Sequence, residues 1–432
     1  MSSSLATRIA EEFAAATPQH GEQRRRAMLA LAERGLPTSR DENWKYVNLR
    51  PLEKVRFAPP AAESAPAPGL QDLPVPVARS ARYTFVDGRF VPALSTPESH
   101  AGVHVESMKS SEGPVLSGSA FDDSELTPDL RFVLLNTAFA TDGAAIRIDP
   151  ETDCPTCIEL VFLATVDSKA GASYPRVSVK VGTGSRVGLI ERHVSAGSDS
   201  NFINSAVQVE LARDARAHHY RIQQTGSRAL WFDSLTAKLA ENAQYQLHSV
   251  SLGGLSARST VHVQLAGELS EVGLFGVSVG EKNQVHDTYA VVEHIAPNAR
   301  TEQSFRGISG GRARVAFNGK IVVRKGANGT DSRQSLRGLL AGKDAEIDVR
   351  PQLEIYTDDV KCNHGATAGK LDDNMLFYLL SRGLDRETAQ RLLKWAFLED
   401  VVARIDVPEL RRQIEQSLAG QLNETASLRE LI

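Results

Sequence analysis

Two side chains with metal-ligand chemistry lie close together near the C-terminal end of the chain. The segment Leu353–Gly365 contains Cys362 and His364. If it is extended, both side chains project from one face of a strand, and Asp358 and Val360 share that face. A thiolate beside an imidazole is a soft ligand pair suited to zinc or to iron–sulfur species. Because such sites need about four ligands, the others would come from another chain. The alternative is a packed cysteine and a surface histidine.

The other two cysteines, Cys154 and Cys157, are spaced like half of a zinc or redox site. The chain has only three cysteines, so no second pair accompanies them, and we favour two partly buried thiols at the mouth of a strand. If stacked β turns separate Cys157 from Cys362, about seven turns at about 4.8 Å each place them roughly 30–35 Å apart. The two cysteine regions therefore do not form one site.

Histidines are numerous in the middle of the chain, but their pattern does not predict a metal site. His218 and His219 would face opposite sides of a strand, so they cannot bind one metal together. We interpret most of these residues as surface residues or hydrogen-bonded core residues: His218, His219, His248, His262, His286 and His294.

The sequence lacks the P-loop of nucleotide hydrolases. Each Gly-Lys pair, at Gly319, Gly342 and Gly369, lacks the upstream glycine and the following Ser or Thr of that motif. No His-Glu-x-x-His zinc motif occurs either. We therefore do not expect this chain to hydrolyse ATP through a P-loop.

The composition is that of an ordinary globular protein. The chain has 432 residues, a formal net charge of −4, 41% hydrophobic residues and 24% charged residues, which allows two or three domains. A near-neutral balance argues against nucleic-acid binding, which needs a basic stripe. No apolar run is long enough to span a membrane, and the N-terminus lacks the pattern of a secretory signal. With few cysteines, we expect a cytoplasmic protein without a membrane partner.

The long central region is expected to form a parallel β-helix, a solenoid of stacked turns. Short β-rich runs alternate there with polar turns. An apolar residue followed by a small residue recurs at intervals of 30, 28, 26, 30 and 28 residues. This pattern starts at Val181, Leu211, Leu239, Leu265, Ile295 and Val323, with a further copy at Leu340. Such a period is typical of solenoids, although the strands of an antiparallel sandwich are also regularly spaced.

Shifts in composition divide the chain into five parts. Helical patterns mark the two ends, and six prolines mark a linker near the N-terminal end. The parts are an N-terminal helical domain (1–57), a Pro/Ala-rich linker (58–80), a mixed hairpin and helix segment (81–150), the β-helix core (151–366) and a C-terminal helical domain (367–432).

Local signals predict the elements outside the core. Asp87 and Gly88, between β-rich flanks, predict a type I′ hairpin turn, and residues 132–139 predict a helix. Three C-terminal helices are expected to begin near Asp372, Asp385 and Pro408. The second should bury the apolar face formed by Ala389, Leu392, Leu393, Ala396, Phe397 and Val401.

A series of motifs runs from about residue 40 to 405. They are Asp41–Tyr46, Asn48–Leu52, Leu135–Phe139, Asp142–Gly143, Gly329–Asp331, Ala345–Asp348, Pro351–Tyr356, Val360–Ala366 and Leu371–Arg382. In this order they resemble the SufB/SufD family, which belongs to the SUF system of iron–sulfur cluster assembly. The block between Gly319 and Ala366 is the most specific.

Within that family the sequence is similar to the SufD branch. SufB-like chains carry a cysteine in the region held here by Thr330–Ser332, and a Glu-His-Glu-Ala motif where this chain has Lys361–Ala366. A clustered N-terminal cysteine motif of the SufB sort is also missing, and Cys154 and Cys157 do not replace it.

The resemblance implies a mainly β fold with a right-handed parallel β-helix core, flanked by N-terminal and C-terminal α-helical domains. It also implies a complex with SufB and two copies of the ATPase SufC. In that complex the β-helix core forms a heterodimer with the SufB-like paralogue, and the C-terminal helices dock the SufC-like ATPase. For a chain without SufB, a homodimer is one alternative, and the resemblance does not decide whether it forms.

For the site, the resemblance implies that His364, with Cys362 nearby, lies at the interface with SufB. There it would help to hold a nascent iron–sulfur cluster beside a SufB thiolate. The cluster is transient, and none is bound stably by this chain alone. The candidate residues for docking the ATPase are Leu376, Tyr378, Leu379, Arg382, Leu392 and Phe397.

We therefore expect a non-catalytic scaffold subunit for iron–sulfur cluster assembly, not an enzyme. One alternative is a carbohydrate-active β-helix enzyme, but such enzymes are usually exported, and Asp358 and Asp359 would point to opposite faces of a strand. The other alternative is a purely structural partner of SufB and SufC that supplies no cluster ligand.

Overall fold

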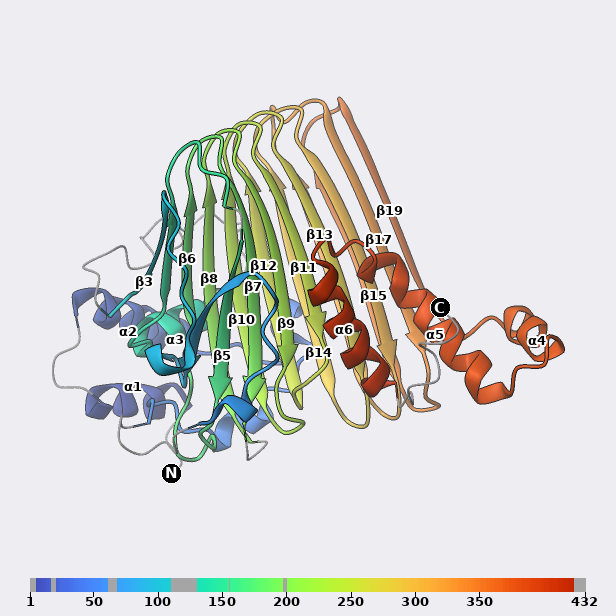
Figure 1. Cartoon of the computed structure of the whole chain (residues 1–432), viewed down its shortest axis with the longest axis horizontal. Helices are drawn as coiled ribbons and strands as arrows, with labels where there is room; N and C mark the ends of the chain where they lie inside the picture. The colour runs from blue at the N-terminus through green and yellow to red at the C-terminus, as the bar shows by residue number, and fades with distance from the viewer. Residues whose placement is uncertain are drawn as a thin grey trace.

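The computed structural model describes residues 5–16, 21–60, 68–109, 130–154, 156–196 and 200–422, and its core is a solenoid of two facing β-sheets (Figure 1). Successive solenoid strands alternate between a ten-stranded and a nine-stranded sheet, here called sheet A and sheet B. Neighbouring strands within each sheet are parallel, except for one antiparallel pair at the N-terminal end of each sheet. The expected architecture, a mainly β solenoid with helices at both ends of the chain, is confirmed.

The strands of the two sheets are ordered along the solenoid axis. Sheet A contains β1 (Ser80–Val86), β2 (Arg89–Phe90), β5 (Cys157–Ala164), β7 (Arg186–Ser195), β9 (Arg216–Gln224), β11 (Gln244–Ser251), β13 (Glu271–Gly280), β15 (Arg300–Ser309), β17 (Thr330–Leu340) and β19 (Val360–Gly369). Sheet B contains β3 (Val103–Ser107), β4 (Ala144–Ile148), β6 (Arg176–Val181), β8 (Phe202–Leu211), β10 (Leu230–Leu239), β12 (Ser256–Leu265), β14 (Val285–His294), β16 (Arg314–Val323) and β18 (Glu346–Ile355).

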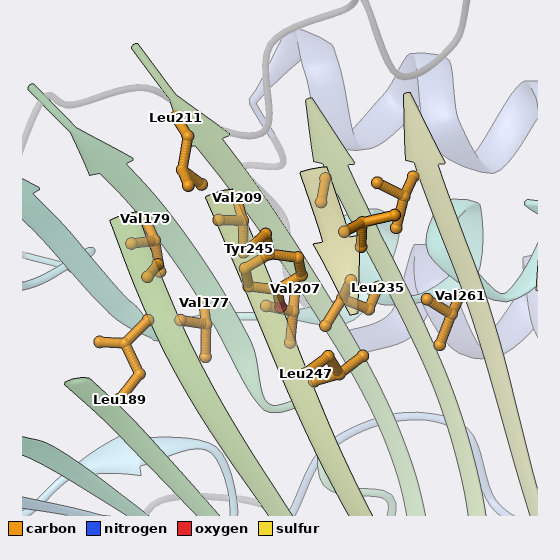
Figure 2. Packing of buried hydrophobic residues seen from close by; sticks show 14 of the residues in the cluster. Val177, Val179, Leu189, Val207, Val209, Leu211, Leu235, Tyr245, Leu247 and Val261 are labelled. Carbon is orange, nitrogen blue, oxygen red and sulfur yellow. The ribbon is translucent and has the colours of Figure 1, made fainter. Parts of the chain in front are cut away.

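Alternate residues of each strand point into the space between the sheets, and most of them are apolar. Equivalent positions stack from turn to turn because the register is unshifted. In sheet B, Val177 pairs with Val207, Val207 with Leu235, and Leu235 with Val261 (Figure 2). All four are buried, so every added turn covers the apolar surface of the previous one.

The sequence repeat matches the ends of the sheet B strands, with two errors. Ile295 follows β14, whose last residue, His294, is the register partner of Leu265 and Val323. Val181, Leu211, Leu239 and Leu265 each end a strand of sheet B, as does Val323. Leu340 instead ends β17, which belongs to sheet A. The true equivalent is Ile355, the register partner of Val323. Apolar strand ends occur in both sheets, so the local pattern does not tell them apart.

The N-terminal helices pack on the outer face of sheet B. They are α1 (Leu5–Ala16), α2 (Glu22–Arg34) and α3 (Arg131–Phe139), with α3 against β8 and β10. Trp44, in a short 3₁₀ helix, is buried against Phe132 and Phe232, and the Arg258 guanidinium lies 4.5 Å from its ring centre. Part of the predicted linker, residues 61–67, lies outside the described residues.

The predicted hairpin is present, and it begins the solenoid. Asp87 and Gly88 both have positive φ, as a type I′ turn requires, and they connect antiparallel β1 and β2. β1 also pairs in parallel with β5, and β4 pairs with β6. Strands of the solenoid sheets thus begin at Ser80, before the predicted core.

The three C-terminal helices are α4 (Asp373–Ser381), α5 (Arg386–Val402) and α6 (Pro408–Gln421). The Asp372 and Asp385 carboxylates cap the first two by accepting backbone N–H groups. α5 lies on the outer face of sheet A against β13 and β15, and α6 lies on the same face, while α4 extends beyond the last strands (Figure 1). The expected face of α5 is partly wrong: Ala396 is exposed, and Leu398 is buried.

Candidate functional site at the open end of the solenoid

β18 and β19 are the last strands of their sheets, and no described strand pairs with their outer edges. Their exposure reflects this position: every residue of β19 is exposed or half-buried, whereas residues on alternate positions of β17 are buried. An open edge leaves backbone N–H and C=O groups available for pairing with another chain. The end of the solenoid is therefore a surface suited to a partner.

Cys362 and His364 project from the same face of β19, as the spacing predicts. Their register partners on β17 are the buried residues Ser332 and Gln334, so this is the inner face of the solenoid. Cys362 is half-buried and packs on the small apolar cluster around Ile321, whereas His364 is exposed. The sequence thus places a thiol and an imidazole side by side at the uncovered end of the core.

Asp358 does not belong to this face, contrary to the expectation from an extended segment. β18 ends at Ile355 and β19 begins at Val360, so Asp358 lies in the connection between the two sheets. The solenoid must change sheet there, and the two-residue alternation holds only within a strand.

The environment of Cys362 favours the protonated thiol. Burial raises the pKa of Cys362, and the nearby negative charge of Asp331 raises it further. A thiol must lose its proton to ligate a metal, so metal binding here would release a proton.

Within the described residues, no group of three or more His, Cys, Asp or Glu side chains is arranged to hold a metal ion. Cys362 and His364 supply only two of the roughly four ligands that such a site needs. On their own, these two side chains are therefore an incomplete metal site.

Cys154 and Cys157 lie at the other end of the solenoid. Seven strand-to-strand steps in sheet A separate β5, which begins at Cys157, from β19. The two thiols pack on different sides of the sheet, with Cys154 against the inner cluster and Cys157 against the cluster beneath the C-terminal helices. Burial raises the pKa of Cys157 to about 11. This supports two packed, protonated thiols rather than a metal or redox pair.

The histidines divide between the two faces of the sheets. His218 and His219 face opposite sides, as predicted: His218 lies 3.2 Å from Asp406, and His219 is buried inside the solenoid. The other four, His248, His262, His286 and His294, are also buried.

Sequence reasoning missed a charged network inside the solenoid. The Arg221 guanidinium donates to Glu191 at 2.6 Å and to Asp233 at 2.6 and 2.7 Å, and all three residues are buried. The rings of His193 and His219 lie 2.6 and 3.3 Å from the Glu191 carboxylate. The Arg221 charge and these imidazoles hold the pKa of Glu191 well below its usual range, despite its burial. The signal available in the sequence was the presence of charged residues at strand positions whose alternate neighbours are apolar and face inward.

One hydrolase-like motif is also explained by burial. Residues Gly307–Gly311 have the Gly-x-Ser-x-Gly spacing of a nucleophilic serine. Ser309, however, is fully buried on the inner face of β15, and its hydroxyl donates to the backbone carbonyl of Ala313 at 2.7 Å. This serine is not accessible to a substrate.

The expected docking residues have different exposures. Tyr378 and Arg382 are exposed, Leu379, Leu392 and Phe397 are half-buried, and Leu376 is only 6% exposed. Two side chains that were not predicted, Met375 and Phe377, are 59% and 71% exposed on α4. The open apolar surface of the C-terminal helices thus lies on α4.

Two family models together match most of the chain. Residues 9–160 match the SufBD protein N-terminal region, and residues 163–397 match the SufBD core domain of the SUF system for iron–sulfur cluster assembly. The chain belongs to the SufBD family. Its core match begins within β5 and ends within α5, so it includes the strand that carries Cys362 and His364.

Curated relatives agree with this assignment. The chain is 31% identical to the iron–sulfur cluster assembly protein SufD of Escherichia coli over 95% of both chains. A SufBD family protein of Synechocystis is 27% identical over 89% of this chain and 87% of its own length. A chloroplastic protein of Arabidopsis thaliana, ABCI7, is 31% identical over 58% of this chain and 53% of its own length. These relationships assign the chain a role in iron–sulfur cluster assembly.

None of the helices in the described parts of the chain is long and apolar enough to cross a membrane.

Proposed function

We propose that this SufBD family member is a non-catalytic scaffold subunit, which holds a nascent iron–sulfur cluster at an interface with a SufB-like partner. The observation that carries the proposal is the position of Cys362 and His364. They share the inner face of β19, at the uncovered end of the solenoid. The cluster is cargo that this chain holds only until assembly is complete.

The open edges of β18 and β19 are the proposed surface for the SufB-like chain. Pairing of the two solenoid ends would satisfy free backbone groups and would cover the half-buried apolar residues of the last turn. It would also bring ligands of the second chain to the two ligands here. A neutral His364 imidazole offers a lone pair to iron, and Cys362 offers its sulfur after losing a proton.

The proposed site for a SufC-like ATPase is α4. Met375, Phe377 and Tyr378 are exposed on this helix, which extends beyond the sheets (Figure 1). Because the sequence lacks a P-loop, a partner would supply ATP hydrolysis. We propose that ATP-driven movement of the docked ATPase pulls on α4 and opens the solenoid interface, which admits iron and sulfide.

The test is anaerobic purification of the tagged chain from its own cells, with identification of the co-eluting proteins and assay of iron and acid-labile sulfide. We expect a SufB-like chain and an ATPase in the complex. His364→Ala should lower the cluster content about tenfold or more, the range seen for residues that support metal sites. Cys362→Ser should lower it as well.

The matched control is Asn363→Ala, an exposed neighbour on the opposite face of the same strand. It should retain the wild-type cluster content. If His364→Ala and Cys362→Ser retain partners, iron and sulfide at wild-type levels, the ligand role is wrong and the chain is a purely structural subunit.

A further inference from the structure

A buried glutamine lies directly behind the candidate ligand His364. Gln334 on β17 is the register partner of His364 on β19, so the two side chains are neighbours on the inner face. Adjacent parallel strands lie about 4.8 Å apart, so the two side chains start from neighbouring backbone positions. Gln334 is 4% exposed, whereas His364 is exposed.

The Gln334 amide has one satisfied end and one free end. Its Nε2 donates to Oε1 of Gln303, the next residue inward on the same ladder, at 2.8 Å. Its Oε1 is buried and has no hydrogen-bond partner among the described residues. A buried carbonyl oxygen without a partner costs about 1–3 kcal/mol, so it is a strong acceptor for any N–H that reaches it.

The opposite sheet leaves room for this amide pair. Gly319 on β16 faces Gln334, and a Cβ atom at Gly319 would lie 2.2 Å from Nε2 of Gln334 and 3.0 Å from Oε1 of Gln303. Any larger residue at this position would displace the amide. The Gln334 side chain therefore fits in the space left by the missing Cβ of Gly319. Its hydrogen bond to Gln303 fixes Nε2 and leaves Oε1 without a partner.

We propose that Gln334 is a positioning residue for His364. When the exposed His364 ring turns toward Gln334, this Oε1 accepts a hydrogen bond from one imidazole N–H. This selects one neutral tautomer and leaves the lone pair of the other ring nitrogen directed toward the open end of the solenoid. Metal-ligating histidines characteristically have such a partner on their second nitrogen. The inference deepens the proposed function, because it assigns a purpose to the ring orientation of the proposed ligand.

The test is nitrogen NMR of the full-length chain alone, with ¹⁵N-labelled histidine and the His364 signals assigned by comparison with His364→Asn. The shifts of the two ring nitrogens report which of them carries a proton. We expect a single neutral tautomer in the wild type and a mixture of two tautomers in Gln334→Met, which keeps the volume but lacks the acceptor. Gln334→Leu, which also lacks the acceptor, replaces the methionine variant if that one unfolds.

The control is Gln352→Met, the same substitution on the outer face of β18 in the same final turn. Gln352 donates to Asn318 rather than to His364, so the His364 tautomer should not change. A wild-type tautomer in both Gln334 variants would overturn the proposal.

A second measurement links the tautomer to assembly. In the purified complex, Gln334→Met should lower the iron and sulfide content about tenfold while the partners still co-elute. Unchanged contents in this variant would contradict a positioning role in assembly. The NMR result is independent of the cluster, so a failure of the His364→Ala assay would count against the proposed function alone.

Discussion

The covered turns and the last turn of the solenoid use similar polar residues in different ways. In the middle of the core, Arg221 donates hydrogen bonds to both Glu191 and Asp233, and all three residues are buried. In the last turn, Cys362 and His364 occupy the same inner face, but no further turn covers them. Both sets of residues point toward the inside of the solenoid. They differ in whether a further turn of the solenoid covers them.

This difference shows how a repeat architecture creates a site. A polar residue inside a covered turn must find its partners within the chain, because an unpartnered buried charge is costly. In the last turn, a side chain on the inner face is not covered by this chain. It is therefore available to contact a second molecule that binds at the end of the solenoid. The candidate site therefore lies where the repeat stops, without any departure from the strand pattern.

The largest expected effect comes from removing the central charge of the covered network. Arg221→Met would leave the Glu191 and Asp233 carboxylates buried without their shared cation. Breaking a buried ion pair on one side costs about 3–5 kcal/mol, so we expect a loss of that size in the free energy of unfolding. Urea denaturation followed by circular dichroism measures it.

The control for this substitution is Arg300→Met. Arg300 pairs with Glu271 at 3.2 Å on the exposed outer face, where an ion pair contributes about 0–1 kcal/mol. Equal losses in the two variants would mean that burial does not distinguish the covered network from the surface.

A second prediction concerns an imidazole in a covered turn. Burial lowers the pKa of His286 to about 4 from an ordinary value of 6.5, so the folded chain keeps this ring neutral while the unfolded chain protonates it. The associated stability is present above pH 6.5 and is lost as the pH falls toward 4. For this shift the loss between pH 7.5 and pH 5 is about 2 kcal/mol.

His286→Leu should remove that part of the pH dependence, as measured by urea denaturation at several pH values. The comparison variant is Ser278→Ala, which removes the hydroxyl 3.0 Å from the His286 ring but keeps the imidazole. It should lose stability on acidification as the wild type does. If the pH profile of His286→Leu is unchanged, this ring is not held neutral by its covered position.

Much of the fold could be predicted because its determinants are local. Alternation within strands and a nearly constant interval between polar turns predict a solenoid, and Asp385 and Pro408 mark helix starts. Assignment of Leu340 to the wrong sheet shows the limit, because both sheets end their strands with similar residues. Which of Leu398 and Ala396 on α5 is buried depends on how the helix packs against sheet A, and those strands are distant in sequence.

The site could be predicted only in part for the same reason. The shared face of Cys362 and His364 follows from two-residue spacing within one strand. Their neighbours Ser332 and Gln334 depend on the register between strands that are distant in sequence, which no local pattern specifies. Glu191 and Arg221 were missed because charged residues at inner positions resemble surface residues until the opposite sheet is in place.

The smallest expected effect concerns the thiol in the uncovered turn. Asp331→Asn removes a negative charge that raises the pKa of Cys362, so the pKa should fall and the thiolate fraction at pH 8 should rise. The change is modest because burial, the larger cause, remains. The rate of alkylation against pH measures it in a background of Cys154→Ser and Cys157→Ser. A partner that covers the last turn should bury Cys362 further. It should therefore slow alkylation of Cys362 both with Asp331 and with the Asp331→Asn substitution. If the SufB-like partner leaves that rate unchanged, it does not cover this end, and the contrast between covered and uncovered turns does not define the site.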